Sequence, residues 1–224
     1  ANIERKITNL PITEIQLNSV SFFYNQEKMI LNNITYSFKR GQKYVIFGQS
    51  GSGKTTLIML LASFLKPKKG SIAYFSNDTL IDSNPDISYL IQDDFLFDDT
   101  IRNNVKISNP EITDDTLECI IEDCLLKNVE KALDYKSIGE NGCKISGGER
   151  KRVQLAQSLA RTSASIIIFD ELSSSLDSKS FDIIMSNIQK YLANKICILI
   201  EHNTSYDYKN FTRLTIHDGK LYYD

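Results

Sequence analysis

The feature that most constrains this chain is one octapeptide, Gly48–Thr55 (GQSGSGKT), which fits the pattern G-x-x-x-x-G-K-[ST]. It follows the strand-like run 43–47 and precedes a helical apolar pattern that continues through Phe64. The octapeptide is therefore predicted to form a turn between a strand and a helix. Glycines in such a turn let successive backbone N–H groups point toward an anion at the start of the helix.

Side chains within this turn suit a triphosphate. Lys54 supplies a positive charge for the β- and γ-phosphates, and the Thr55 hydroxyl can ligate Mg²⁺. A flexible loop that matched the pattern by chance would not need the strand and the helix on either side of it. The predicted ligand is a purine nucleoside triphosphate with Mg²⁺. The predicted phosphate-binding residues are Gly48, Gln49, Ser50, Gly51, Ser52, Gly53, Lys54, Thr55 and Thr56.

Composition excludes several other classes of protein. The 224 residues are 42% apolar and 24% charged, which is typical of a globular chain with one large domain or two small ones. The net charge of −2 predicts no nucleic-acid partner. The longest apolar run, 57–62, is far shorter than the roughly 20 residues of a membrane-spanning helix. No signal peptide is predicted, and the first residue, Ala1, suggests processing or a piece of a longer polypeptide.

The cysteines predict neither a zinc site nor a disulfide framework, because they form no C-x-x-C pair and have no histidine close in sequence. Buried thiols in a reducing compartment are the preferred interpretation. The four are Cys119, Cys124, Cys143 and Cys197.

Strand-like and helix-like segments alternate, which predicts an α/β core containing a parallel sheet. Strands are predicted at 12–24, 33–38, 43–47, 71–75, 87–91, 166–169 and 196–200, with a hairpin over 212–223 around Asp218-Gly219. Several helices are predicted within 100–162, and one at 179–192. We expect one domain over 1–224, in which 1–92 and 163–224 form the nucleotide-binding core and 93–162 an inserted helical subdomain.

A second acidic element follows the apolar run Ile166–Phe169, which is typical of a strand covered on both faces. Asp170 ends this run, where its carboxylate can join the Mg²⁺ shell. Glu171 is then placed to accept a proton from the water that attacks the γ-phosphate. An ordinary acidic strand end would look the same, but the phosphate-binding turn upstream favours the functional interpretation.

A second anion site is predicted at Ile145–Glu149 (ISGGE), just before a helix-like stretch at 149–161. Ser146 can cap that helix, which is the simpler interpretation. The two glycines after it suggest that something approaches the backbone closely. Lys54 and Ser146 are 92 positions apart, so the chain carries two separate phosphate-seeking helix starts.

Taken in order, these motifs resemble those of the nucleotide-binding domains of ABC transporters, and the resemblance covers nearly the whole chain. Gly48–Thr55 resembles the Walker A loop, Ile166–Glu171 the Walker B strand with its catalytic glutamate, and Ile145–Glu149 the LSGGQ signature. The signature departs from the usual pattern at its first residue, Ile for Leu, and at Glu149, where Gln is common. We expect Glu149 to leave the Ser-Gly-Gly hydrogen-bond donors intact.

Four further positions match in the same order, and the resemblance assigns each a role. Tyr24 would stack on adenine, and Gln92 of the Q-loop would join the Mg²⁺ shell and assist catalysis. Asp177 of the D-loop would couple two sites, and the switch histidine His202 would stabilise charge on the γ-phosphate. Taken singly, Tyr24, Gln92 and His202 each have a non-functional interpretation. Tyr24 could be a half-buried strand aromatic, Gln92 a solvated side chain and His202 a residue at a strand end. His217 is assigned to a surface hairpin.

The resemblance implies a P-loop NTPase core with a mixed sheet, an N-terminal antiparallel β subdomain and an inserted α-helical subdomain. It also implies that two such domains pair head to tail, with ATP between the Walker A loop of one and the signature of the other. Ser146, Gly147 and Gly148 would complete the partner's site. Two different anion sites on each copy can meet across a two-fold axis, which agrees with this arrangement.

Two phrases resemble those of exporters, namely 98–105 (DDTIRNNV) and the X-loop 138–142 (IGENG). They favour the ATPase domain of a half-transporter, at the cytoplasmic face of the cell membrane, whose transmembrane domain would contact residues 92–106. The Asn-, Ile- and Lys-rich composition suggests a bacterial peptide or bacteriocin as cargo.

Three alternatives are weighed against an exporter. A soluble ABC ATPase of chromosome structure would carry a long coiled coil before the signature, and one of translation would usually carry two cassettes. An importer ATPase subunit is the second alternative. The third is a binding module that keeps ATP without hydrolysing it, which the presence of Glu171 and His202 opposes.

Overall fold

The structure is a computed structural model that describes residues 7–8, 10–25, 28–91, 95–202, 206 and 208–223. The chain divides into two compact units. The first comprises Ala1–Ile87, Ser163–Ile168 and Leu192–Asp224, and the second comprises Ser88–Thr162 and Phe169–Tyr191.

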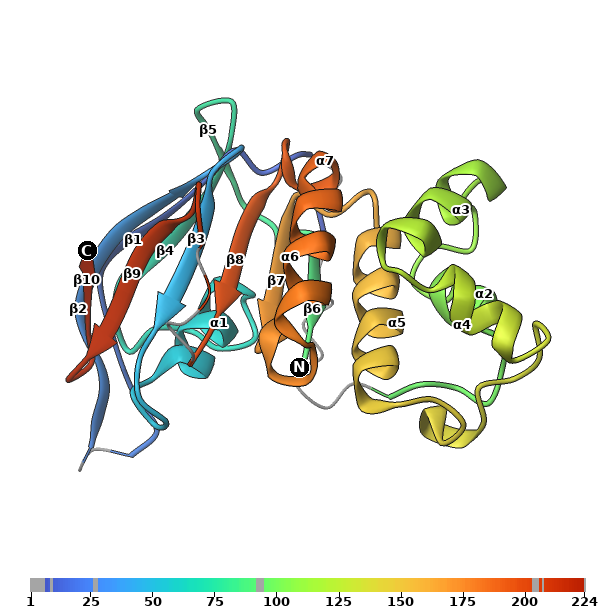
Figure 1. Ribbon diagram of the computed structural model, residues 1–224. Coiled ribbons are helices and arrows are strands. Elements are labelled where there is room, and N and C mark those ends of the chain that lie inside the picture. Colours follow the sequence, from blue (N-terminus) through green and yellow to red (C-terminus); the bar gives the residue numbers. More distant parts are fainter. Residues whose placement is uncertain are drawn as a thin grey trace. The chain divides into compact units, whose positions relative to one another are not determined.

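The first unit contains an antiparallel sheet with the strand order β2-β1-β4-β5 (Figure 1). Apolar and polar residues alternate along β1, and the pair Ile15 and Phe38, which face each other across β1 and β2, is fully buried. β5 is absent from the sequence prediction because three half-exposed or exposed residues carry no periodic signal. The strands are β1 (Glu14–Phe23), β2 (Met29–Lys39), β4 (Lys69–Ser76) and β5 (Thr79–Ile81).

The second sheet is mixed, with the strand order β10-β9-β3-β8-β7-β6. β3 pairs in parallel with both β8 and β9, and β9 pairs antiparallel with β10. Every residue of β7 and β8 is buried, which confirms the prediction of a strand covered on both faces for β7 and the prediction of a strand for β8. The division between the units falls within β6 and β7. The strands are β3 (Lys43–Phe47), β6 (Ile87–Leu90), β7 (Ile166–Asp170), β8 (Ile196–Ile200), β9 (Thr212–His217) and β10 (Lys220–Tyr223).

Helix α1 (Lys54–Leu61) starts at the predicted position but ends before Phe64. The cause is a local C-terminal cap. The Ser63 N–H donates to the Leu60 carbonyl at 3.0 Å, and the Phe64 N–H donates to the Met59 carbonyl at 2.8 Å. This pair of bonds is a Schellman motif, and Ser63 adopts the left-handed conformation (φ 58°) that such a motif requires. The helix therefore ends three residues before Phe64, to which the apolar pattern extends.

The second unit is mainly helical (Figure 1), and the helices found within the range 100–162, where the sequence predicts several, belong to it. The long helix α5 packs against α2 and α3, and its buried residues include Val153, Leu155 and Ala156. Glu130 is buried as well, and the Arg102 guanidinium pairs with its carboxylate at 3.1 Å through Nε and Nη2. The helices are α2 (Ile101–Lys106), α3 (Asp114–Asp123), α4 (Lys127–Ala132), α5 (Gly147–Ala160), α6 (Ser178–Asn187) and α7 (Gln189–Leu192), with 3₁₀ turns η1 (Glu140–Gly142) and η2 (Leu172–Ser175).

The cysteine prediction is only half right. Cys124 and Cys197 are buried, whereas Cys119 and Cys143 are exposed, and all four are free. Burial raises the pKa of Cys197 to about 12, which makes that thiol unreactive at neutral pH.

No helix among the residues that the structure describes combines the length and the apolar composition that crossing a membrane requires.

Candidate functional site

The predicted phosphate-binding turn lies between β3 and α1, within the first unit. The Ser52 N–H donates to the Gln49 carbonyl at 3.1 Å and closes the turn. Gly53 precedes α1 with φ +106°, a conformation that L side chains rarely adopt, and a Cβ there would lie 2.8 Å from Leu31 Cδ2. The sequence pattern therefore has a local cause, because only glycine fits the last position before the helix.

Lys54 is the first residue of α1, and its side chain is only 6% exposed. Its ammonium donates to the carbonyls of Gly48 at 2.7 Å and Gln49 at 3.0 Å. These bonds hold a positive charge inside the turn, beside the N–H groups at the start of the helix. The neighbouring Thr55 is exposed, whereas Thr56 is buried. The turn thus combines a cation, a helix start and an accessible hydroxyl.

Tyr24 follows β1 directly and is 62% exposed, so it is not the half-buried strand aromatic of the non-functional interpretation. Its hydroxyl oxygen lies 3.3 Å from Thr56 Oγ1, and its ring meets that of Phe22 edge to face at 5.0 Å. These contacts fix the ring beside the first turn of α1. Stacking on adenine stays a prediction.

A cavity of about 440 Å³ opens beside the phosphate-binding turn. It is lined by 49–52 of that turn, by 28–30 at the start of β2 and by 216–219 at the β9–β10 turn. All of these segments belong to the first unit. The volume lies within the range of small-molecule sites.

Asp170 ends β7 within the second unit, and two side chains hold it. Its carboxylate accepts a hydrogen bond from the Tyr89 hydroxyl at 3.1 Å, and its main-chain carbonyl accepts one from the Lys151 ammonium at 3.1 Å. Burial and, next, the Asp170 carboxylate raise the pKa of Tyr89, so its hydroxyl remains a proton donor at neutral pH.

Sequence reasoning missed both Tyr89 and Lys151. Tyr89 is the middle residue of the predicted strand 87–91, and no local pattern signals its bond to Asp170, which is 81 positions away. Lys151 lies one helical turn before Leu155 on the buried face of α5. A lysine within an apolar helical stripe is the signal that was available there.

Glu171 follows Asp170 in the left-handed conformation, with φ 51° and ψ 53°. This conformation costs a non-glycine residue about 1–3 kcal/mol. The carbonyl of Glu171 accepts hydrogen bonds from the Ser174 hydroxyl at 2.8 Å and from the Ser174 N–H at 3.3 Å. The half-buried acid is therefore held in an unfavourable backbone state, which is a frequent mark of functional positions.

The predicted signature begins α5, and Ser146 is its N-cap. The Glu149 N–H donates to Ser146 Oγ at 3.2 Å, while the Glu149 carboxylate accepts from the Ser146 N–H at 2.7 Å and from its hydroxyl at 2.9 Å. These Ser146 bonds lower the pKa of Glu149, which is therefore ionised at neutral pH. The expectation that Glu149 leaves the donors intact is wrong for Ser146.

Gly148, the second glycine of the signature, is required by a close contact within the same chain. A Cβ on Gly148 would lie 2.8 Å from the Ser175 carbonyl oxygen of η2. Asp177, two residues after Ser175, is exposed and caps α6, because its Oδ1 accepts a hydrogen bond from the Ser180 N–H at 2.9 Å. The sequence indicates that something approaches the backbone of the glycine pair closely. At Gly148 this is the segment that leads into Asp177 of the predicted D-loop, in the same unit.

The remaining predicted residues are less well defined. Gln92 lies outside the described residues. His202 is exposed and lies just beyond β8 in the first unit. His217 is exposed at the β9–β10 turn, and its Nδ1 lies 3.3 Å from Asp218 Oδ2, as expected of a surface hairpin. Lys54 and Thr55 belong to the first unit, and Asp170, Glu171 and the signature belong to the second.

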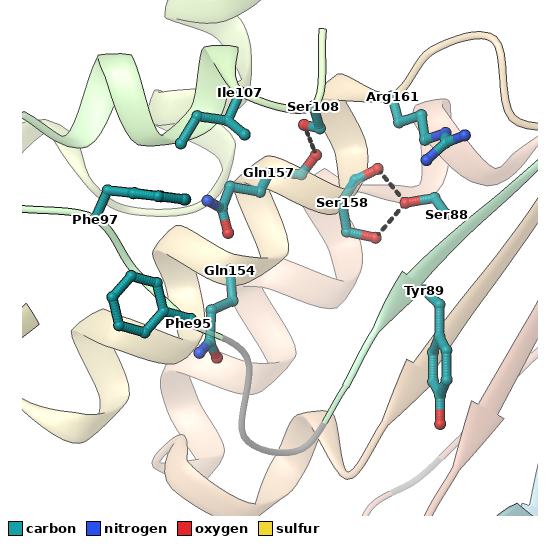
Figure 2. A pocket seen from close by; sticks show the side chains of 10 residues that line it. All are labelled: Ser88, Tyr89, Phe95, Phe97, Ile107, Ser108, Gln154, Gln157, Ser158 and Arg161. Atoms are coloured by element: carbon teal, nitrogen blue, oxygen red, sulfur yellow. Dashed lines mark hydrogen bonds between the residues drawn. The ribbon is translucent and has the colours of Figure 1, made fainter. Parts of the chain in front are cut away.

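A second cavity, of about 210 Å³, lies within the helical unit (Figure 2). On one side are three apolar side chains, Phe95, Phe97 and Ile107, which are 52%, 51% and 49% exposed. The other side is polar and is formed by Gln154 and Gln157 of α5 and by Arg161, the residue that follows this helix. We call this cavity the α5 groove.

Hydrogen bonds fix the floor of the α5 groove. The Ser88 hydroxyl at β6 bonds both the carbonyl and the hydroxyl of Ser158 at 2.8 Å (Figure 2). The Gln157 amide donates to the Asn104 carbonyl at 3.0 Å, which ties α5 to α2. The phenylalanines meet edge to face at 5.3 Å and leave much of their apolar surface open to solvent.

Comparisons with known proteins show the family of the chain. An ABC transporter family profile matches residues 31–174, well over half of the chain. The leukotoxin export ATP-binding protein LtxB of Aggregatibacter actinomycetemcomitans is 33% identical over 216 residues, which cover 92% of this chain and 30% of LtxB. The alpha-hemolysin translocation ATP-binding protein HlyB of Escherichia coli O157:H7 is 33% identical over 218 residues, again 92% of this chain and 30% of HlyB.

A solved structure of a bacterial Atm1-family ABC exporter with ATP bound matches with a TM-score of 0.85 at 25% identity, covering 98% of this chain and 39% of the exporter chain. The chain thus spans about a third of the length of these relatives. It belongs to the ABC transporter family, as an ABC ATPase domain homologous to the ATP-binding proteins of exporters.

Proposed function

We propose that this chain binds ATP with Mg²⁺, hydrolyses it, and joins a second copy head to tail to drive an exporter. The observation that carries the proposal is the enclosed Lys54 ammonium, held at the start of α1 by two carbonyls of the glycine-rich turn. A buried cation at the N-terminus of a helix is suited to a polyphosphate and to few other ligands.

Binding follows from the residues of the first unit. The backbone of Gly51–Thr56 and the Lys54 ammonium hold the phosphates, and the exposed Tyr24 ring stacks on adenine. The cavity beside the turn offers room for further parts of the nucleotide. The parallel pairing of β3 with β8 and β9 fixes the start of the turn.

The residues carried over from the resemblance fit Mg²⁺ by their chemistry. Thr55 offers an exposed hydroxyl and Asp170 a carboxylate, and oxygen ligands of this kind are those that Mg²⁺ prefers. These two residues, with the Gln92 amide, would hold the ion. It would supply positive charge to the β- and γ-phosphate oxygens during the reaction.

Glu171, Lys54 and His202 act in the hydrolysis step. The Glu171 carboxylate accepts a proton from a water molecule, and the water oxygen bonds to the γ-phosphorus. The bond between that phosphorus and the β,γ-bridging oxygen breaks, so ADP and inorganic phosphate leave. Lys54 and His202 stabilise negative charge on the γ-phosphate oxygens.

The direct test is phosphate release from ATP by the 224-residue chain. We expect turnover in the presence of Mg²⁺ that EDTA abolishes and that added Mg²⁺ restores. Because an isolated domain turns over slowly when pairing is weak, the assay should span a wide range of chain concentrations. A chain that releases no more phosphate than a heat-denatured sample at every concentration would overturn the proposed function.

Pairing involves the signature and the D-loop. We propose that Ser146, Gly147 and Gly148 of one copy complete the ATP site of the other, and that Asp177 links the two sites. The capping box places the ionised Glu149 carboxylate at the helix start that would meet the γ-phosphate. Like charges there weaken pairing.

Glu149→Gln should therefore strengthen ATP-dependent pairing about two- to fivefold, on the scale of one charge at a helix N-terminus. The amide oxygen still accepts the Ser146 N–H bond, so the cap of α5 is kept. Sedimentation of the variant with Mg-ATP over a concentration series measures the effect. The gain should shrink as salt is raised, because an exposed charge is screened. Weaker pairing at low salt would contradict the prediction.

We propose that the α5 groove receives a segment of a transmembrane domain, which places the chain at the cytoplasmic face of the cell membrane. Its three half-exposed apolar side chains form the kind of surface that a partner covers. Phe95 and Phe97 belong to the predicted contact region 92–106, and Ile107 follows it directly. Relatives named for export and translocation support an exporter over the importer and soluble alternatives. A peptide or bacteriocin as cargo stays a prediction.

A further inference from the structure

Lys151 is a buried lysine on the helix that begins with the signature. Its side chain is 3% exposed, and its ammonium donates to the Asp170 main-chain carbonyl at 3.1 Å. Burying an ammonium is costly, so a lysine at such a place needs partners that hold its charge. An apolar residue would fill the same position on the buried face of α5 at lower cost, which argues that the hydrogen bond matters more than the packing.

The carbonyl that Lys151 holds belongs to the peptide group between Asp170 and Glu171. The orientation of that peptide plane helps set the φ of Glu171, which is +51° and left-handed. The next carbonyl, that of Glu171 itself, accepts the Ser174 hydroxyl bond at 2.8 Å. Both peptide groups that flank the Glu171 side chain are therefore held, one by Lys151 and one by Ser174.

The Asp170 side chain is held separately. Its carboxylate bonds the Tyr89 hydroxyl, which comes from β6 and not from α5. Loss of the Lys151 bond therefore leaves the Asp170 carboxylate its Tyr89 partner, and the peptide before Glu171 loses a charged donor. The two effects can be separated by experiment.

We propose that Lys151 is a positioning residue for ATP hydrolysis: its ammonium fixes the Asp170–Glu171 peptide and thereby aims the Glu171 carboxylate. The proposal rests on the proposed function, in which Glu171 activates water. Because Lys151 lies five residues after the Ser146 cap on the same helix, it also ties the signature end of α5 to the acid of its own copy. A shift of α5 on pairing would thus reach Glu171 directly.

The test is Lys151→Met in the 224-residue chain, which keeps the length of the side chain and removes the donor. We expect kcat to fall about tenfold or more, on the scale of one charge-assisted hydrogen bond, with KM for ATP within about twofold. The Mg²⁺ concentration for half-maximal activity should also stay within about twofold, because Asp170 keeps its Tyr89 partner. A merely structural role would not separate kcat from KM in this way.

Lys195→Met is the matched control. The Lys195 ammonium donates to the Ala164 carbonyl before β7, so it makes the same kind of bond near the opposite end of the same strand. We expect a comparable loss of thermal stability and an unchanged kcat. An equal loss of kcat in Lys195→Met, or a wild-type kcat in Lys151→Met, would overturn the proposal.

Lys151→Gln provides a second route if Lys151→Met gives no cooperative thermal transition. Its amide is a neutral donor on a shorter side chain, and we expect a loss of kcat of about fivefold or more with unchanged KM. A wild-type kcat in that variant overturns the inference about Lys151 alone. A wild-type chain without ATP turnover overturns the proposed function and this inference together, so the two failures are distinguishable.

Discussion

Glu171→Gln should reduce ATP turnover at least about 100-fold while leaving ATP binding intact, because an amide cannot accept the proton that a general base removes. The amide has nearly the same shape, and the Ser174 bonds to the Glu171 backbone do not depend on its side chain. ATP that binds but is not cleaved should hold two copies together. Phosphate release measures the first effect, and gel filtration with Mg-ATP, in which a dimer should elute, measures the second.

Glu122→Gln is a suitable control for this variant. It makes the same carboxylate-to-amide change on an exposed side chain of α3. That side chain forms an ion pair with Lys127 at the surface. We expect wild-type turnover and no trapped dimer. A Glu171→Gln chain that stays monomeric in Mg-ATP would count against joint binding of the nucleotide by two copies, and one that hydrolyses ATP at the wild-type rate would remove Glu171 from the mechanism.

Lys54→Ala should weaken ATP binding at least about 100-fold and abolish ATP-dependent pairing, because the charge lost is enclosed by the turn and little screened by water. The fold should survive, since the turn is also closed by the Ser52 bond to Gln49 and set by Gly53. Calorimetric titration with Mg-ATP measures the affinity, and thermal unfolding checks the fold.

Lys66→Ala removes an exposed lysine shortly after α1 and is the control. We expect its ATP affinity to stay within about twofold of wild type, as is usual for an exposed charge away from a ligand. Unchanged ATP turnover in Lys54→Ala would disprove the assignment of the glycine-rich turn as the phosphate site.

Local sequence signals predicted much of the fold. β3 and β8 have the bounds expected from their apolar runs, and the β9–β10 hairpin turns at Asp218 and Gly219, both with positive φ. Dipeptides that tolerate positive φ at both positions define this kind of turn, so its signal is contained in two residues. The end of α1 was missed because Ser63 takes a left-handed conformation that usually belongs to glycine.

Site residues were predictable where a motif fixes the backbone, and less so where the partner is distant in sequence. The turn around Lys54 is local, and its glycines reveal it. By contrast, the Lys151 bond to Asp170 joins residues 19 positions apart. Its acceptor is a main-chain carbonyl, which every residue carries, so the sequence does not indicate the partner. Glu149 was noticed as a departure, yet its effect depends on the rotamer that brings its carboxylate back to Ser146.

The left-handed backbone of Glu171 has a consequence for protein engineering. Glycine or asparagine accepts that conformation more readily, so a search for thermostable variants would favour either residue at this position. Both changes would remove the acid on which turnover is proposed to depend. Position 171 therefore cannot be optimised for thermal stability and for turnover at the same time. Selection by melting temperature alone would enrich inactive chains.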